Sequence, residues 1–190
     1  MLEVVVTPVF ALFAAYLLGS LPASFLAGRL AGIDLRQHGS RSLGATNVWR
    51  VLGPRYAVPV GLFDVAKGTV AAMVFGPMAG AAAWLPLATG AAAILGHVFP
   101  IFLRFRGGKG VATAAGVLLG VAPAAVGLAA TAWLAILLTT GYVSVASMTA
   151  AVVFPAAAWL LRSDDPILLA TGLAVGVFVF YTHRSNIRRL

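Results

Sequence analysis

The sequence contains no cysteine and very little charge. Without thiols the chain can form no disulfide and no thiolate metal site. Only 9% of its 190 residues are charged and 61% are hydrophobic, whereas an average soluble domain is about 25% charged and about half apolar. With a mean hydropathy of +0.99, the chain has more apolar surface than a small water-soluble domain can bury. The composition therefore predicts an integral membrane protein.

The apolar segments also lack the alternation of polar and apolar residues that a membrane β-barrel requires. They are instead long runs of alanine, leucine, valine and glycine, and about 20 such residues form a helix that crosses the hydrocarbon core. These runs use most of the chain, so we expect a single transmembrane domain over residues 1–190. The first run follows Met1-Leu2-Glu3, which lacks the positive region of a cleaved signal peptide, so it is expected to be a retained span.

We expect an all-α fold with about seven transmembrane helices. Proline costs the interior of a helix about 3 kcal/mol, so residues 110–140 should form two short helices that meet at Ala122-Pro123. Asp164-Asp165-Pro166 should start the last helix. The expected spans are residues 4–27, 56–78, 80–99, the two halves of 110–140, 142–161 and 167–181.

The net charge of +8 and the pI near 11.2 raise the question of nucleic acid. The chain has no aromatic and basic platform of the kind that single-strand binders use, and its cations lie in short loops between spans, as the positive-inside rule describes. With the N-terminus outside, the loops at 29–55 and 104–109 and the tail at 183–190 carry eleven of the 13 lysines and arginines. Lys67 lies within a span, and only Arg162 falls outside. We therefore expect a cytoplasmic C-terminus and no nucleic-acid partner.

One loop combines cations with glycine directly before a helix-forming run. It reads Arg106-Gly107-Gly108-Lys109-Gly110 and precedes Val111. Glycine lets backbone N–H groups approach a ligand closely, and a helix N-terminus adds free donors and partial positive charge. The pattern predicts an anion site; a basic loop held at the surface by topology alone is the alternative. It is not a Walker A loop, because Leu103 and Gly110 stand where glycine and serine or threonine are needed.

The loop at 38–50 repeats this composition and suggests a second anion site. Its small and charged residues are Gly39, Ser40, Arg41, Gly44, Thr46, Asn47 and Arg50. A polar loop with helix-capping side chains would look similar. Asp64 and Lys67, three apart, share one helix face. Such a pair just inside a bilayer is usually functional or mutually neutralised, and the alternative is a pair that orients the neighbouring loop.

Two histidines lie at the ends of apolar runs. His97 is a candidate general base, a phosphate donor or a cap to a carbonyl. His183, with Arg184 and Asn186 nearby, either faces the same pocket or marks orientation.

A transporter or channel for a small anion is the rival function, since helices broken at Pro22 and Pro123 would suit it. Its charged site should lie near the bilayer midplane, whereas these clusters lie at one face. A structural membrane subunit would leave the repeated clusters of glycine and cations unexplained.

These motifs together resemble a known family. They read Leu18-Gly-Ser-Leu-Pro22, Gly39-Ser40, Gly44-Ala-Thr-Asn47 with Arg50, Asp64 with Lys67-Gly68, Gly96-His97, Pro100, Phe102, Phe105-Arg-Gly-Gly-Lys-Gly-Val-Ala-Thr113 and Tyr181-Thr-His-Arg-Ser-Asn186-Ile. Over essentially its whole length the chain resembles the bacterial acyl-phosphate:glycerol-3-phosphate acyltransferases. The family usually reads Ser-Gly-Asn-Pro/Val-Gly-Ala-Thr-Asn in the first loop, where this chain has Arg41-Ser42-Leu43. Arg106 stands where lysine is common, and Ser185 where an acidic residue is common.

The resemblance implies transfer of a fatty acyl group from acyl phosphate to the 1-hydroxyl of sn-glycerol 3-phosphate, giving 1-acylglycerol 3-phosphate (lysophosphatidate) and phosphate. It implies seven spans with an external N-terminus, a bacterial inner-membrane location and an active site at the cytoplasmic face, with no cofactor and no metal. A His-x₄-Asp acyltransferase motif is absent, because Leu43, Phe102 and Arg188 stand where the aspartate would be.

The resemblance also implies the residues of the site. Catalysis is expected to involve His97, Lys109, Ser40 and Arg50. The predicted phosphate-binding residues are Ser40, Gly44, Thr46, Asn47, Arg50, Lys67, Arg106, Gly107, Gly108, Lys109, Gly110, His183 and Asn186. Either His97 or a substrate phosphate accepts the hydroxyl proton, and the phosphate is favoured. The acyl-chain length, the oligomeric state and the phosphate that each cluster binds are left open.

Overall fold

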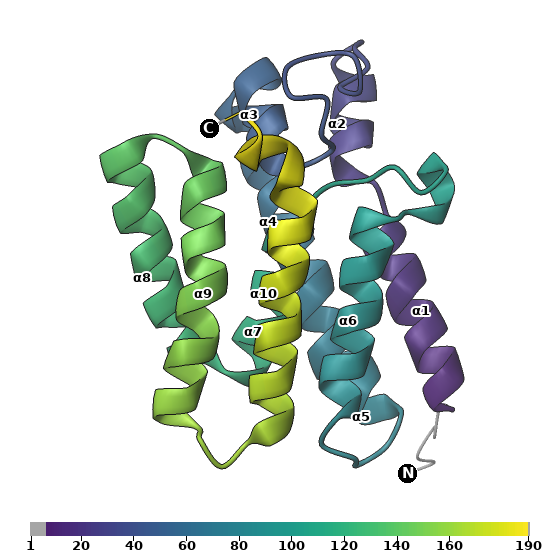
Figure 1. Ribbon diagram of the computed structural model, residues 1–190. Helices are drawn as coiled ribbons and strands as arrows, with labels where there is room; N and C mark the ends of the chain where they lie inside the picture. The colour runs from purple at the N-terminus through teal and green to yellow at the C-terminus, as the bar shows by residue number, and fades with distance from the viewer. Residues whose placement is uncertain (1–6, 190) are drawn as a thin grey trace. The chain divides into compact units, whose positions relative to one another are not determined.

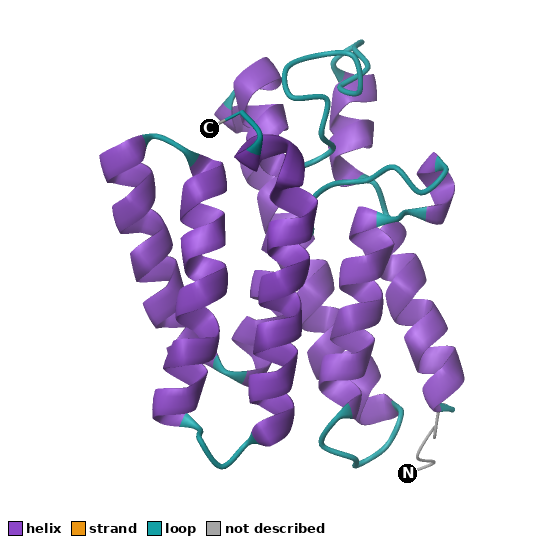
Figure 2. Ribbon diagram, viewed as in Figure 1, coloured by secondary structure: helices purple, strands orange, loops and turns teal. Residues whose placement is uncertain are grey.

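The computed structural model describes residues 7–189, and every regular element in that range is a helix (Figure 2). The chain divides into two compact units between Val121 and Ala122, and each is described by itself. The predicted starting residues Met1-Leu2-Glu3, the first three residues of the expected span at 4–27 and the terminal Leu190 lie outside the described range. That residues 1–190 act as one domain stays a prediction.

The first apolar run forms two helices rather than one. Helix α1 covers Pro8–Ser20 and α2 covers Ala23–Leu30, with Leu21 in an extended conformation between them (Figure 1). Proline carries no N–H for a helical hydrogen bond, so Pro22 accounts for the break. The predicted interruption near the end of this run is confirmed, although α2 continues three residues beyond the expected boundary at Ala27.

The loop expected at residues 29–55 contains a helix, so that part of the prediction is wrong. Helix α3, Ala45–Leu52, begins after Gly44 and ends at Gly53. Its apolar residues recur three or four apart, which produces one apolar face. Helix α4, Pro54–Val70, then continues through the π-helical turn η1, Ala71–Phe75, into α5, Gly76–Met78. These three elements make up the expected span at 56–78.

Helix α6 covers Leu85–Val98, so it begins five residues later than expected. It is followed by the short 3₁₀ turn η2, Ile101–Leu103, and by α7, Val111–Val121. Helix α8, Pro123–Thr140, begins at the proline. The predicted division of residues 110–140 at Ala122-Pro123 is confirmed.

Glycines allow two helix pairs in the first unit to approach closely. An added Cβ on Gly19 would overlap the backbone of Ala93 in the packing of α1 against α6. One on Gly116 would overlap the carbonyl of Val65 where α7 packs against α4. Small residues at such contacts are typical of membrane helices, whose association depends on close packing. The second contact fixes the part of α4 that carries Asp64 and Lys67.

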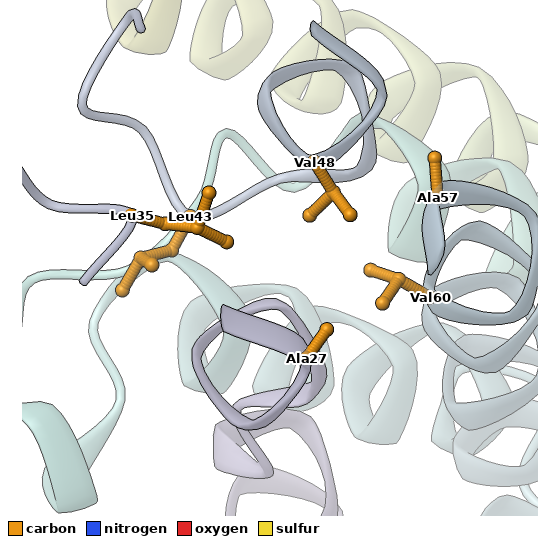
Figure 3. Close-up of a cluster of buried hydrophobic side chains, with 6 residues drawn as sticks. All are labelled: Ala27, Leu35, Leu43, Val48, Ala57 and Val60. Atoms are coloured by element: carbon orange, nitrogen blue, oxygen red, sulfur yellow. The ribbon is translucent and has the colours of Figure 1, made fainter. Parts of the chain in front are cut away.

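A cluster of apolar side chains ties the first polar loop to its neighbouring helices (Figure 3). It comprises Ala27 of α2, Leu35 and Leu43 of the loop, Val48 of α3, and Ala57 and Val60 of α4. Leu35 is 1% exposed and Val48 is completely buried. The loop is therefore anchored at both ends by side chains that α2, α3 and α4 enclose.

The second unit consists of α8, α9 (Val143–Leu161) and α10 (Pro166–Ile187). The side chain of Asp165 accepts a hydrogen bond of 2.9 Å from the N–H of Leu168, which caps α10 as Asp-Asp-Pro predicts. Helix α10 continues six residues beyond the expected end at Tyr181. His183 and Asn186 therefore belong to the helix, which extends into the basic tail expected at residues 183–190.

Six helical stretches within residues 7–189 are long and apolar enough to cross a membrane, against about seven expected. The remaining apolar helix, α7, has only 11 residues. At 1.5 Å per residue it spans roughly 16 Å, about half of the hydrocarbon core. Several large apolar side chains in the six stretches are exposed, including Val9 and Leu138, as expected of surfaces that face lipid.

Candidate active site

A buried group of three polar side chains lies in the first unit. Lys67 Nζ is 2.8 Å from Asp64 Oδ1 and 2.9 Å from His97 Nδ1. His97 Nδ1 is 3.3 Å from the same carboxylate oxygen. Asp64 and Lys67 are each 2% exposed and His97 is 8% exposed. A buried charge is stable only when it is paired and hydrogen-bonded, and this arrangement provides both.

Three elements bring these groups together. Asp64 and Lys67 are three residues apart on α4, so their side chains leave one face of the helix. His97 lies in the last turn of α6. The third element is the break between α1 and α2, where the carbonyl of Leu21 accepts a hydrogen bond of 3.4 Å from Lys67. Tyr16 of α1 also donates a 2.7 Å hydrogen bond to the carbonyl of Phe99, which ties α1 to the end of α6.

The glycine-rich loop folds back on the end of α6. Gly107 N–H donates to the carbonyl of Val98 at 3.1 Å, and Gly108 N–H donates to that of His97 at 3.2 Å. These two N–H groups are therefore engaged with the backbone at the end of α6. An added Cβ on Gly107 would overlap the carbonyl of His97, and one on Gly108 would overlap His97 Nε2 and lie 2.6 Å from the carbonyl of Leu43. Glycine is required here for close approach.

A small hollow opens between this loop and the break after α1. It is shallow, and the space of about 240 Å³ at its mouth includes open solvent. Asp64, His97, Gly107 and Gly108 line it together with the residues around Pro22. Ser24 also lines it, and its hydroxyl is buried without a hydrogen-bond partner among the described residues. The hollow thus combines a histidine edge, a serine hydroxyl and bare glycine α-carbons.

The first polar loop is held by the side chain of Asn47. Its Oδ1 accepts a 2.8 Å hydrogen bond from Ser40 N–H, and its Nδ2 donates to the carbonyls of His38 and Leu35 at 3.1 and 3.3 Å. Asn47 is 1% exposed. Both amide hydrogens are engaged within the loop, so the observed contacts of this side chain are structural. Its predicted contact with a phosphate stays a prediction.

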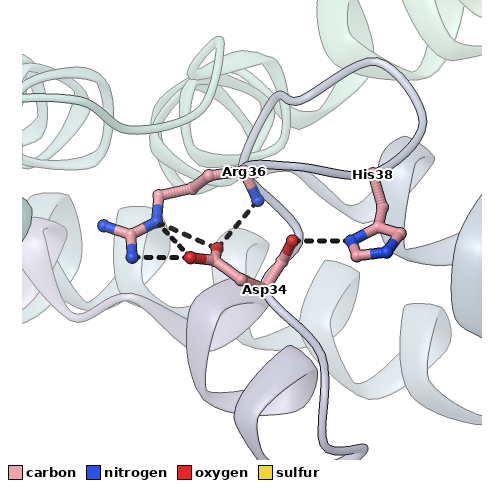
Figure 4. A network of polar contacts seen from close by, with 3 residues as sticks. All are labelled: Asp34, Arg36 and His38. Carbon is pink, nitrogen blue, oxygen red and sulfur yellow. Dashed lines mark hydrogen bonds and ion pairs between the residues drawn. The ribbon is translucent and has the colours of Figure 1, made fainter.

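The same loop carries a surface ion pair (Figure 4). The guanidinium of Arg36 bonds both carboxylate oxygens of Asp34, with a shortest distance of 2.7 Å, and the N–H of Arg36 donates to the same carboxylate at 3.0 Å. These hydrogen bonds lower the pKa of Asp34 from 3.8 to about 2. His38 donates from Nδ1 to the carbonyl of Asp34 at 2.8 Å. The three residues stiffen the turn that leads to Ser40.

The predicted site residues fall into three groups in the structure. Lys67, His97, Gly107 and Gly108 meet at or beside the hollow. The second group lies on the two loops and the start of α3. Thr46, Arg50 and Arg106 are exposed, and Ser40, Gly44 and Lys109 are half-buried. Gly110 is buried and has φ +81°. His183 and Asn186 lie on α10 in the second unit. The contact of these residues with substrate stays a prediction.

Sequence reasoning missed the hydroxyl of Ser24. The residue lies close to the recognised Leu18-Gly-Ser-Leu-Pro22 segment, but only the fold shows that its Oγ is buried and that it lines the same hollow as His97. It also missed that His97 and Lys67, 30 positions apart, share a hydrogen bond. The helical spacing of Asp64 and Lys67 was the one available signal, and the ion pair it indicated is present.

Comparison with known proteins gives a consistent result. The family model described as glycerol-3-phosphate acyltransferase matches residues 9–190. Glycerol-3-phosphate acyltransferase 3 of Bacillus anthracis is 44% identical over 186 residues, which cover 97% of this chain and 92% of that protein. The glycerol-3-phosphate acyltransferase of Gloeobacter violaceus is 48% identical over 182 residues, covering 93% of this chain and 88% of that protein.

Solved structures agree with these relatives. The crystal structure of PlsY (YgiH), an integral membrane glycerol 3-phosphate acyltransferase, in its glycerol 3-phosphate form has a TM-score of 0.90 and 39% sequence identity, covering 96% of this chain and 90% of that chain. The lysophosphatidic acid form of the same protein has a TM-score of 0.88 and 38% identity. Extensive identity, matching fold and six apolar spanning helices lead to one conclusion: the chain belongs to the glycerol-3-phosphate acyltransferase family of integral membrane enzymes.

Proposed function

We propose that the protein transfers a fatty acyl group from acyl phosphate to the 1-hydroxyl of sn-glycerol 3-phosphate. The products are 1-acylglycerol 3-phosphate (lysophosphatidate) and inorganic phosphate, and the reaction begins phospholipid synthesis. The names of the relatives support the acceptor. The lysophosphatidic acid form of the PlsY neighbour supports the product. The motifs shared with the acyl-phosphate-dependent family support the donor.

One observation carries the proposal: the cation-rich glycine loop folds against a buried histidine at the edge of a hollow. Both substrates are phosphates, and both need positive charge and closely approaching backbone. Ser40, Arg50 and Lys109 are the groups that we assign to phosphate oxygens. Positive charge placed before the reaction at the position of the departing phosphate lowers the barrier, because it stabilises the charge that develops there.

The chemistry requires no protein nucleophile. An acyl phosphate is an activated mixed anhydride, so the hydroxyl oxygen attacks the carbonyl carbon directly. The bond between that carbon and the bridging oxygen breaks, and phosphate leaves with the electron pair. The hydroxyl proton passes to a phosphate oxygen of the substrates. The protein contributes by holding the hydroxyl against the carbonyl and by neutralising the phosphate.

The proposal includes seven spans, with the N-terminus outside and the active site at the cytoplasmic face of a bacterial inner membrane. The distribution of cations supports this orientation, because residues 29–55, 104–109 and 183–190 hold eleven of the 13 lysines and arginines. In this arrangement α7 is a short span, the fourth in chain order, and its 11 residues require the bilayer or the neighbouring helices to adapt. Glycosylation or cysteine-labelling mapping of the loops tests the orientation.

The decisive assay supplies membranes with acyl phosphate and glycerol 3-phosphate, with acyl-CoA as the competing donor. We expect lysophosphatidate from acyl phosphate only, and preference for acyl-CoA would overturn the donor assignment. Lys109→Ala is expected to reduce turnover by about 10²- to 10³-fold, the usual effect of removing one transition-state donor. Arg162→Ala is the matched control, because it removes one cation from an exposed turn. Normal turnover in Lys109→Ala would remove the phosphate role of this lysine.

A further inference from the structure

The contacts of Lys67 define the protonation of His97. An ammonium group has three N–H donors and no acceptor. Lys67 Nζ faces three acceptors: Asp64 Oδ1 at 2.8 Å, His97 Nδ1 at 2.9 Å and the carbonyl of Leu21 at 3.4 Å. The carboxylate of Asp64, 2.8 Å away, favours the ammonium form of this amine. His97 Nδ1 must therefore accept a hydrogen bond, and in a neutral imidazole the proton is then on Nε2.

Two other protonation states fit these distances poorly. A proton on Nδ1 directed at Asp64 would use the longer contact of 3.3 Å. It would also place an N–H group 2.9 Å from the ammonium, so two donors would face each other and Lys67 would lose an acceptor. A doubly protonated His97 adds a second positive charge at the same short distance. The Nε2–H form alone satisfies Lys67 completely.

The other two histidines have the opposite arrangement. His38 Nδ1 is 2.8 Å from the carbonyl of Asp34, and His183 Nδ1 is 2.8 Å from the carbonyl of Val179. A carbonyl oxygen only accepts, so Nδ1 carries a proton in both. His97 is thus distinguished from the two remaining histidines of the chain by the group that its Nδ1 meets. This contrast provides internal references for an experiment.

The Nε2 edge of His97 lies at the hollow. It is so close to Gly108 that an added Cβ there would overlap it. Within residues 7–189 no protein group forms a hydrogen bond with Nε2, whereas Ser24 contributes a second unpaired polar atom to the same lining. An Nε2–H group in this position is a hydrogen-bond donor toward whatever oxygen enters the hollow.

We propose that Lys67, held by Asp64 and the carbonyl of Leu21, is a positioning residue that fixes His97 in the Nε2–H form. In this form His97 donates a hydrogen bond to a substrate oxygen in the hollow and does not take the hydroxyl proton. That proton goes to a substrate phosphate oxygen, and the number of protons on His97 stays the same through the reaction. The identity of the oxygen rests on the proposed function, whereas the position of the proton on His97 does not.

Nitrogen NMR of the substrate-free protein with ¹⁵N-histidine, in lipid nanodiscs, tests the protonation directly. We expect His97 to show a protonated Nε2 and a bare Nδ1, and His38 and His183 to show a protonated Nδ1. The His97→Gln variant assigns the signals. A bare Nε2 or a doubly protonated ring at neutral pH would overturn the proposal, whether or not the protein transfers acyl groups.

A second measurement tests the part of Lys67. The double variant Asp64→Asn with Lys67→Met removes the ammonium without leaving a buried unpaired carboxylate. In the double variant we expect the Nδ1 and Nε2 signals of His97 to shift toward a mixture of the two neutral forms. The single variant Lys67→Arg, which keeps a cation at this position, should retain part of the original pattern. An unchanged His97 spectrum in the double variant would show that another group sets the protonation, which overturns the role of Lys67.

Kinetics then separate a donor from a base. A glutamine amide N–H reaches the position of Nε2 but does not accept a proton at neutral pH. We expect His97→Gln to keep kcat within about tenfold of the parent, and His97→Ala to lose about 10²-fold or more. Equal losses in the two variants, with normal folding, would identify His97 as a base and overturn the donor role. Absence of acyl transfer in the parent would instead contradict the proposed function and leave the NMR test decisive.

Discussion

Two buried hydroxyl groups of the first unit have no hydrogen-bond partner among the described residues, and they allow a matched experiment. Ser24 Oγ lines the hollow beside His97, whereas Thr113 Oγ1 lies inside the packing of α7 against α4. Ser24 is 3% exposed and Thr113 is completely buried. A buried polar group without a partner costs about 1–3 kcal/mol. Removing each hydroxyl should therefore stabilise the fold.

The structure gives different magnitudes for the two sites. Thr113→Val keeps the shape of the side chain in a closed environment, so we expect the free energy of unfolding to rise by about 3 kcal/mol. The side chain of Ser24 borders a hollow that water can enter, so its hydroxyl is less costly to bury. We therefore expect Ser24→Ala to raise the free energy of unfolding by only about 1 kcal/mol. For a chain of this size each kcal/mol raises Tm by about 2–4 °C. Thermal unfolding in detergent should thus show a rise of about 6–12 °C for Thr113→Val and about 2–4 °C for Ser24→Ala.

The value of kcat/KM should change in only one of the two variants, Ser24→Ala. If the Ser24 hydroxyl bonds a substrate oxygen in the hollow, its loss removes about 0.5–1.5 kcal/mol of binding, which lowers kcat/KM by about two- to tenfold. Thr113→Val should leave kcat/KM unchanged. An unchanged Tm for Thr113→Val would refute the reasoning about unpaired hydroxyls. An unchanged kcat/KM for Ser24→Ala would refute the contact between this hydroxyl and the substrate.

Three further predictions concern the loops. Gly108→Ala should reduce acyl transfer by about 100-fold, because its Cβ displaces the ring of His97 and an error of about 1 Å has this effect; Gly127→Ala, which meets open space on α8, should be neutral in the same assay. Asn47→Ala should lower the free energy of unfolding by about 2–4 kcal/mol, since three hydrogen bonds are lost, whereas Thr46→Ala on the exposed face should change it little; equal unfolding curves would contradict this. The lowered pKa of Asp34 means that its ion pair stabilises the folded loop above pH 3.8 and loses this effect as the pH falls through about 2; a carboxyl ¹³C titration with a midpoint near 3.8 would contradict the assignment.

Hydrophobic runs and prolines made the helices of this chain predictable, because both act locally. Pro22 and Pro123 were expected to interrupt their apolar runs, and both breaks are present, whereas Pro59 and Pro155 lie inside the continuous helices α4 and α9. The ends were less predictable. Helix α10 continues through Arg184 to Ile187, since the start of a basic segment does not prevent helical hydrogen bonds. The change from apolar to basic residues therefore marked the end of the apolar span but not the end of the helix.

The site was predictable only where its residues are near in sequence. Asp64 and Lys67 are one helical turn apart, so their pairing followed from spacing. The hydrogen bond between Lys67 and His97 depends on how α4, α6 and the break after α1 pack together. No local sequence pattern encodes this packing. The glycine loop shows the same limit, since Gly107 and Gly108 donate to the end of α6 and present their α-carbons to the hollow. Residue type indicated close approach, but only the fold shows which atoms approach.

The segment Arg41-Ser42-Leu43 departs from the sequence that is usual in the family. It shows how a loop with different side chains can keep the same backbone position beside the site. Arg41 has φ +60°, a conformation that suits the glycine usual at this position and costs another residue about 1–2 kcal/mol. The turn is nevertheless kept by the hydrogen bond from its N–H to the carbonyl of His38, at 3.0 Å. Leu43 replaces one apolar residue with another and is 5% exposed within the apolar cluster. Because that burial fixes the backbone, the carbonyl of Leu43 stays against Gly108, and the wall of the hollow is preserved although the side chains before it differ.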